Sequence, residues 1–170
     1  MSSPWTVRPE TPADIETVRR ITLDAFGNPG EADLVDALRT DPGWLPGLSH
    51  VAETPEGEVV AHALLTRCRV GDAPAVALAP CSVRSAWQRR GAGDAVIRSL
   101  LEAARASGER TAIVLGHPSY YPRFGFEPAS RFGILAPQEW PDEAFMALAL
   151  DPATGLPSGM VRYAAAFGID

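Results

Sequence analysis

Three strand-like segments in succession constrain the fold of this chain more than any other feature of its sequence. They are Ser49–Glu53, Val59–Val70 and Ala75–Val83, separated by the turn residues Pro55-Glu56-Gly57 and Gly71-Asp72-Ala73-Pro74. Strand-like segments joined by short turns predict neighbouring antiparallel strands. The third segment is apolar almost throughout, which is typical of a strand in the interior of a sheet.

Helical patterns flank these strands on both sides in the sequence. In Thr11–Phe26, Pro12 falls in the first turn and apolar residues recur at helical spacing, which predicts a helix. Glu31–Arg39 shows the same apolar spacing over a shorter length and predicts a second helix. A third helix is predicted over Gly91–Ser107. The remaining predicted elements are strands at Trp5–Arg8, Thr111–Leu115 and Ala144–Leu150, and a turn, a short helix and the start of a strand within Gly116–Phe126. Because no repeat or long linker interrupts the pattern, residues 1–170 are expected to form one domain with α/β layers around one sheet.

Charge and cysteine content argue against several classes of function. The net charge is −6, whereas nucleic-acid-binding domains usually carry an excess of positive charge. The sequence contains no run of about 18 apolar residues, so no membrane span is predicted. The N-terminal MSSPWTVRPE lacks the apolar core of a signal peptide. Cys68 and Cys81 form no CxxC pair and the three histidines are not clustered, so no metal site is predicted. We therefore expect a cytoplasmic protein without nucleic-acid or membrane partners.

A glycine-containing loop, Gln88-Arg89-Arg90-Gly91-Ala92-Gly93, joins the third strand to the third helix. Uncovered N–H groups at a helix start, with Arg84 and Arg98 nearby in the sequence, predict a bound anion. A P-loop would need GxxxxGK[ST], and the chain contains no lysine. A dinucleotide-binding loop would need GxGxxG directly after the first strand, whereas Val96 occupies the third glycine position and several strands precede the motif.

The order of these motifs resembles the GNAT superfamily of N-acetyltransferases, and in particular its YhbS-like branch. The loop fits the pattern [QR]-x-x-G-x-[GA], and Tyr121–Phe126 fits the later signature Y-x-x-x-G-F. The strings VLGHPSYYPRFGFEPAS and EAFMALAL extend the resemblance over most of the chain. It implies an α/β (α+β) fold with a mixed, mostly antiparallel central sheet and helices on both faces. The fourth and fifth strands, here Val76–Val83 and Thr111–Leu115, are expected to splay apart.

The resemblance also implies a co-substrate and the residues that bind it. In this family the loop grips the diphosphate of acetyl-CoA, and the pantetheine arm lies between the splayed strands. The resemblance implies that the residues of this sequence that bind the coenzyme are Cys81, Ser82, Val83, Gln88, Arg89, Arg90, Gly91, Ala92, Gly93 and Asp94. The implied reaction is transfer of the acetyl group to a primary amine by direct attack in a ternary complex.

Tyr121 is the candidate general acid, because the tyrosine at the matching position of the family lies near the coenzyme sulfur. Tyr120 is adjacent and remains the alternative. A general base is also needed, because an amine near pKa 10 must lose its proton before it attacks. The possible bases are Glu31 and His117, with Glu53 and His62 also considered. Cys81 as a covalent nucleophile is disfavoured, because its apolar neighbours would raise the pKa of the thiol.

The acceptor is expected to bind between Phe26–Trp44 and Phe132–Trp140. These ranges contain Trp44, Trp140, Phe132, Asp33, Asp36, Asp41 and Glu139. A small-molecule amine and a protein amine both remain open, as does a homodimer. The alternative function is a catalytically inactive acyl-CoA-binding sensor or regulatory module.

Overall fold

A mixed sheet forms the centre of the molecule in the computed structural model, which describes residues 4–169. Within this range the sheet has nine strands, and its main path runs β1-β2-β3-β4-β5-β8-β6. The strands are β1 (Thr6–Pro9), β2 (Trp44–Glu53), β3 (Val59–Val70), β4 (Ala73–Val83), β5 (Thr111–Leu115), β6 (Glu127–Pro128), β7 (Ile134–Leu135), β8 (Phe145–Ala149) and β9 (Gly159–Arg162). All neighbours pair antiparallel except β4 with β5 and β7 with β9.

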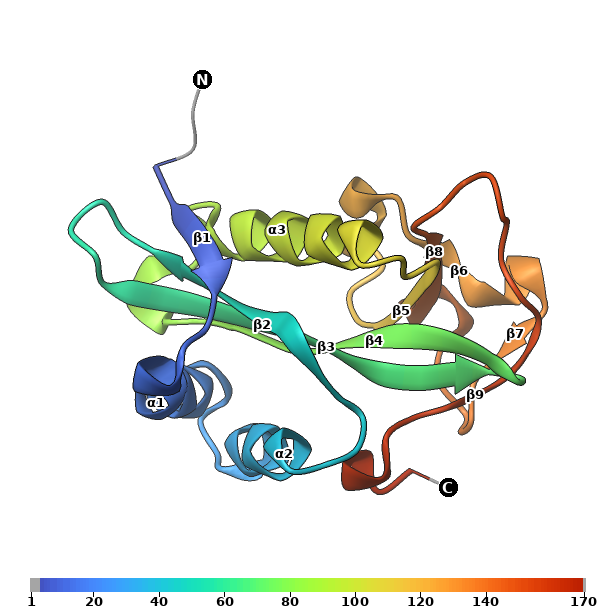
Figure 1. Cartoon of the computed structure of the whole chain (residues 1–170), viewed down its shortest axis with the longest axis horizontal. Helices are drawn as coiled ribbons and strands as arrows, with labels where there is room; N and C mark the ends of the chain where they lie inside the picture. Colours follow the sequence, from blue (N-terminus) through green and yellow to red (C-terminus); the bar gives the residue numbers. More distant parts are fainter. Residues whose placement is uncertain (1–3, 170) are drawn as a thin grey trace.

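Helices cover both faces of this sheet, as Figure 1 shows. On one face lies α3 (Ala92–Ala106), whose buried stripe includes Val96, Ile97 and Leu100. On the other lie α1 (Ile15–Phe26) and α2 (Gly30–Arg39). The apolar stripes recur at helical spacing, so burial of one side of each helix accounts for the layered arrangement. The predicted fold class, with its mostly antiparallel sheet and two helical layers, is confirmed.

Most predicted elements lie where the sequence placed them, with shifted ends. The bounds of β3 and β5 agree with the prediction. The first helix is divided, because a short 3-10 helix at Pro12–Asp14 precedes α1. The strand β2 begins at Trp44 rather than Ser49, and a register shift between these two residues accommodates the intervening Pro46-Gly47.

Two short strands in the tail, β7 and β9, were not predicted. They have two and four residues, which is too short for a period-two pattern to stand out. Their positions come from long-range pairing, since β9 adds to the end of β3 through Arg69 with Arg162 and Val70 with Val161.

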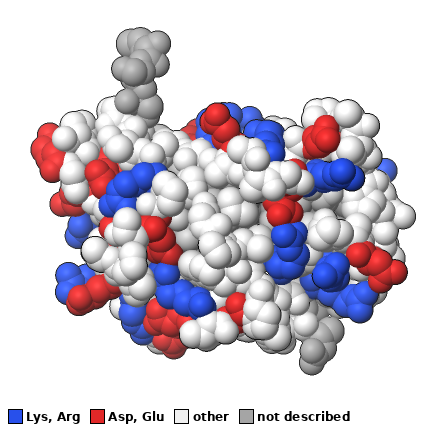
Figure 2. Space-filling model, viewed as in Figure 1, with Lys and Arg blue, Asp and Glu red and all other residues white. Residues whose placement is uncertain are grey.

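Charges of both signs are intermixed over the face of the molecule shown in Figure 2. Around a largely uncharged central area, arginines lie next to acidic side chains rather than in one basic surface. No helix within residues 4–169 is long and apolar enough to cross a membrane. The same range contains no group of three or more His, Cys, Asp or Glu that could hold a metal ion.

His62 is a core residue of β3 and not a base in an open site. It is fully buried, and its Nε2 lies 2.8 Å from the hydroxyl of Ser49. Burial lowers the pKa of His62 to about 3, with smaller contributions from the charges of Arg39 and His50. The imidazole is therefore neutral in the folded protein at neutral pH, whereas in the unfolded chain it takes up a proton near pH 6.5.

This depressed pKa predicts a loss of stability in mild acid. Below pH 6.5 the unfolded state binds a proton that folded His62 does not, so the free energy of unfolding falls by roughly 1.4 kcal/mol per pH unit. His50, whose pKa burial also lowers, adds to this slope. Urea unfolding at several pH values between neutrality and about pH 4.5 measures it, and His62→Gln should flatten it. An unchanged slope in His62→Gln would contradict this assignment.

Candidate active site

The site begins where β4 and β5 separate. These parallel strands pair only at Val76 with Ala112 and at Ala77 with Ile113. On the other side of β4 the register with β3 slips, because Ala63 faces Cys81 whereas Leu65 faces Leu78. Two residues of β4 therefore oppose one of β3, which is a β-bulge and bends the strand. The expected splaying of the fourth and fifth strands is confirmed, and it leaves backbone groups of β4 available to an extended ligand.

A cavity of about 400 Å³ lies at this separation and extends to α2 and the C-terminal segment. Its walls come from strand, helix and loop segments that are far apart in the sequence. The lining residues are Phe26, Glu31, Leu34, Leu78, Ala79, Pro80, Cys81, Leu115, Gly116, His117, Tyr121, Trp140, Tyr163, Phe167 and Ile169. The cavity brings together Cys81, Tyr121, Glu31 and His117, four of the residues singled out in the sequence.

The loop before α3 has the backbone of an anion-binding nest. Arg89 and Gly91 both adopt left-handed conformations, with φ of 64° and 90°, and α3 begins one residue later. Left-handed residues within a turn bring successive N–H groups into one concavity, and the helix dipole adds positive potential there. Arg89, Arg90 and Gly91 are exposed, whereas Ala92 is buried as the first residue of the helix. The loop therefore has a backbone conformation suited to binding an anion.

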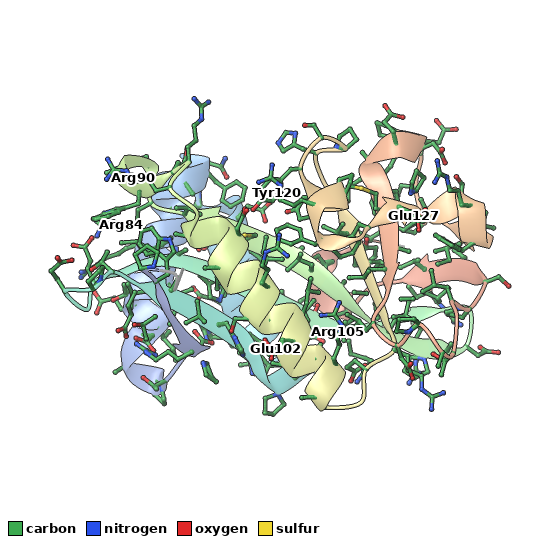
Figure 3. The ribbon with its side chains drawn as sticks, turned by 90° about the horizontal axis from the view of Figure 1, so that it is seen from above. Arg84, Arg90, Glu102, Arg105, Tyr120 and Glu127 are labelled. Carbon is green, nitrogen blue, oxygen red and sulfur yellow. The ribbon has the colours of Figure 1, made fainter. Side chains whose placement is uncertain are left out.

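Neighbouring side chains hold this loop in place. The Gln88 side chain donates to the carbonyl of Val83 at 3.2 Å, and Trp5 donates to the carbonyl of Arg90 at 3.2 Å. The guanidinium of Arg90 also stacks over the ring of Trp87, 5.2 Å from its centroid. Figure 3 shows Arg84 and Arg90 beside the N-terminal end of α3, with Tyr120 on the segment across from it. Two arginines thus remain close to the mouth of the nest.

Asp94 is directed at Tyr120 and Arg123 within the first turn of α3. Its carboxylate accepts a hydrogen bond from the Tyr120 hydroxyl at 2.7 Å and forms an ion pair with Arg123 at 3.2 Å. Gly93 is part of the same close packing, because a Cβ there would lie 3.4 Å from the Tyr120 hydroxyl oxygen. Arg123 offsets the charge that Asp94 would otherwise place next to a phosphate.

The two adjacent tyrosines have different environments. The Tyr120 hydroxyl donates its hydrogen bond to Asp94, whereas Tyr121 lines the cavity. The Tyr121 ring packs edge-on against Tyr120 and Phe126, with centroids 5.0 and 6.0 Å away. It also lies so close to Gly116 that a side chain there would overlap it. Burial raises the pKa of Tyr121, so its phenol is protonated at neutral pH and has a proton to donate.

The candidate bases divide into two in the cavity and two elsewhere. Glu31, in the first turn of α2, and His117, directly after β5, both line the cavity. Glu53 instead accepts a 2.7 Å hydrogen bond from Arg8 on β1, and His62 is buried in the core. The geometry therefore retains Glu31 and His117 as candidates.

The residues of β4 expected to contact pantetheine alternate in direction. The Ser82 side chain is buried toward α1, with its hydroxyl 3.5 Å from that of Thr22. Cys81 and Val83 are partly buried and pack toward the α3 side of the sheet. Burial raises the pKa of the Cys81 thiol to about 12. A thiol with this pKa is protonated at neutral pH, which argues against its use as a nucleophile.

The far wall of the cavity was only partly anticipated. Of the aromatic residues expected around the acceptor, Trp140 lines the cavity, whereas Trp44 packs under Arg39, 5.1 Å from its guanidinium carbon. The contribution of Tyr163, Phe167 and Ile169 to this wall was not predicted from the sequence. These residues carry no periodic pattern, so the only signal was their aromatic and aliphatic character near the C-terminus.

Comparison with known proteins agrees with this geometry. The sequence model of the Acetyltransferase (GNAT) family matches residues 15–126. The uncharacterized N-acetyltransferase YjhQ of Escherichia coli K12 is 41% identical over 136 residues, covering 77% of this chain and 75% of that protein. The uncharacterized N-acetyltransferase YhbS of the same strain is 31% identical over 163 residues, covering 92% of this chain and 95% of YhbS.

Two solved structures of this family contain the coenzyme. Escherichia coli YhbS in complex with CoA superposes with a TM-score of 0.87 at 26% identity, over 99% of this chain and 94% of that one. A Brucella melitensis GNAT acetyltransferase in complex with acetyl-CoA gives a TM-score of 0.79 at 34% identity, over 96% and 97%. The chain therefore belongs to the GNAT family of acetyltransferases, in the branch that contains YhbS, and its co-substrate is acetyl-CoA.

Proposed function

We propose that this protein is an N-acetyltransferase that transfers the acetyl group of acetyl-CoA to a primary amine within a ternary complex. One observation carries the proposal: Tyr121, Glu31 and His117 line a single cavity that begins where β4 and β5 separate. A proton donor and two possible proton acceptors thus lie around a space that an amine can enter beside a coenzyme.

The residues that would hold acetyl-CoA belong to the nest and to β4. Backbone N–H groups from Arg89 to Asp94 bind the diphosphate, and Arg89 and Arg90 add positive charge. Backbone groups of Cys81, Ser82 and Val83 bind the pantetheine arm as an added strand would be bound. The coenzyme supplies an acetyl group that is activated as a thioester.

The protein then moves the protons that the acyl transfer requires. Glu31 or His117, directly or through water, takes one proton from the amine nitrogen, so that its lone pair can form the new N–C bond. As the C–S bond breaks, Tyr121 donates its phenolic proton to the departing sulfur. The second proton that the nitrogen loses on becoming an amide returns to the Tyr121 oxygen, directly or through water, and restores the phenol. The products are the N-acetylated amine and CoA with a free thiol.

Initial-rate kinetics test whether transfer is direct. With acetyl-CoA and an accepted amine both varied, double-reciprocal plots should intersect, and the mass of the protein should not change on incubation with acetyl-CoA alone. Parallel plots and an acetylated protein would contradict direct transfer and favour an acyl-enzyme. Tight coenzyme binding without release of thiol for any amine would instead support the sensor.

A further inference from the structure

The far wall of the cavity is an aromatic surface built by the C-terminal segment. Tyr163 packs edge-on against Trp140, with ring centroids 5.9 Å apart, and in a tilted arrangement against Phe167, with centroids 5.2 Å apart. Phe26, Leu34 and Ile169 complete this wall on the side of α1 and α2. Aromatic and aliphatic groups of this kind bind the apolar body of a ligand, and aromatic faces also attract cations.

Specific contacts fix this segment against the loop after α2. The carboxylate of Asp41 accepts a 3.0 Å hydrogen bond from the backbone N–H of Ala166. Gly43 is in close contact with Ala164, since a Cβ at Gly43 would lie 2.8 Å from that of Ala164. The aromatic wall is therefore held by close packing and a hydrogen bond.

Among residues 4–169, Glu31 is the only acidic side chain that lines the cavity, and no arginine lines it. The chain contains no lysine at all. Within residues 4–169 the Glu31 carboxylate has no hydrogen-bond or ion-pair partner, whereas Asp33 and Asp36 on the same helix both pair with Arg19. Among the described residues, the cavity thus offers one unpaired carboxylate and no arginine to pair with an anionic ligand, and His117 is its one basic side chain.

We propose that the acceptor is a primary amine on an apolar, preferably aromatic, body that carries neither a carboxylate nor a phosphate. This inference rests on the proposed function, since it describes the second substrate of the same site. Glu31 and the aromatic faces attract the ammonium group of the incoming amine, and the wall formed by Trp140, Tyr163 and Phe167 packs against its ring.

The same charges act against other amines. An amino acid would place its carboxylate beside Glu31 with no arginine among the described lining residues to pair with it, which is unfavourable. A polyamine would bury a second ammonium group, for which the described lining residues offer no second carboxylate. Arylalkylamines such as phenethylamine and tryptamine have the single ammonium group and the aromatic body that the site accommodates. Phenylalanine and tryptophan add a carboxylate, and putrescine adds a second ammonium group and lacks the ring.

Matched amines test the inference by steady-state thiol release with saturating acetyl-CoA. We expect kcat/KM for phenethylamine to exceed that for phenylalanine by at least about 100-fold, with the same order for tryptamine against tryptophan and for phenethylamine against putrescine. Phenethylamine should also bind the CoA-saturated protein in a calorimetric titration, more tightly than phenylalanine. Equal or better use of phenylalanine or putrescine, or no binding of phenethylamine, would overturn the inference.

Substitution of Glu31 distinguishes its effect on the choice of amine from a role as the general base. In Glu31→Gln the ratio of kcat/KM for phenethylamine to that for phenylalanine should fall by about tenfold or more, because the repulsion of the carboxylate is removed. Loss of a base would lower both rates together and leave this ratio unchanged. Glu102→Gln, an exposed change on α3, should leave the ratio and the Kd for acetyl-CoA unaltered.

Failure of this inference is distinguishable from failure of the proposed function. If the protein releases thiol with putrescine, phenylalanine or a peptide amine but not with arylalkylamines, it is an acetyltransferase with another acceptor. If it binds acetyl-CoA in calorimetry and no amine of any class supports thiol release, the proposed function itself fails.

Discussion

Replacement of Tyr121 by phenylalanine is expected to lower kcat by about 100- to 1,000-fold, with little change in the Kd for acetyl-CoA. The change removes only the phenolic oxygen and keeps the ring that packs against Tyr120 and Phe126. Because the hydroxyl is the proposed proton source for the coenzyme sulfur, its loss should affect turnover rather than binding. Thiol-release kinetics and calorimetric titration of acetyl-CoA measure the two quantities separately.

The adjacent tyrosine is the matched control for this experiment. Tyr120→Phe removes the hydrogen bond to Asp94 and should lower kcat by no more than a few-fold. In Gly116→Ala the phenol is kept but the Tyr121 ring is displaced, because the new side chain would overlap it. Turnover should fall in that variant too. Normal activity in Tyr121→Phe together with a large loss in Tyr120→Phe would reassign the general acid.

Replacement of Gly91 by valine is expected to weaken acetyl-CoA binding by about 30- to 100-fold. Gly91 has φ of 90°, a conformation that a β-branched residue adopts only with strain. Relief of that strain rotates the peptide groups that form the nest between Arg89 and the start of α3. Isothermal titration with acetyl-CoA measures the change in Kd.

Gly108 supplies a control with the same backbone strain at a distance from the nest. It has φ of 91°, it follows the other end of α3, and an added Cβ would meet no atom within 4 Å. Gly108→Val should therefore cost about 1–3 kcal/mol of stability, similar to Gly91→Val, while the Kd for acetyl-CoA stays unchanged. Equal affinities in the two variants would show that the loop conformation at Gly91 does not hold the coenzyme.

Local turn chemistry explains why the central part of the fold could be predicted. The turns on both sides of β3 contain proline and glycine, and the bounds of β3 agree with the prediction. The anion-binding nest could also be predicted, because glycines and arginines at the start of an amphipathic helix create positive potential and expose backbone N–H groups. In contrast, the early start of β2 at Trp44 depends on a register shift that accommodates Pro46-Gly47, and no local pattern indicates it.

The acceptor wall could not be derived in the same way. Tyr163, Phe167 and Ile169 reach the cavity because the C-terminal segment docks on Asp41 and on the loop after α2, more than a hundred residues away in the chain. Sequence alone also left four candidate bases open, and burial and hydrogen bonding now separate them. His62 is enclosed in the core and Glu53 is paired with Arg8, whereas Glu31 and His117 face the cavity.

The most direct test of the central claim measures both products of one reaction. Purified protein is incubated with acetyl-CoA and phenethylamine, and free CoA thiol and N-acetylphenethylamine are quantified together over time. We expect the two products to appear in equal amounts, and the formation of both to depend on the amine and on Tyr121. Stable binding of acetyl-CoA with neither product formed, for phenethylamine or for any other amine class, would contradict it.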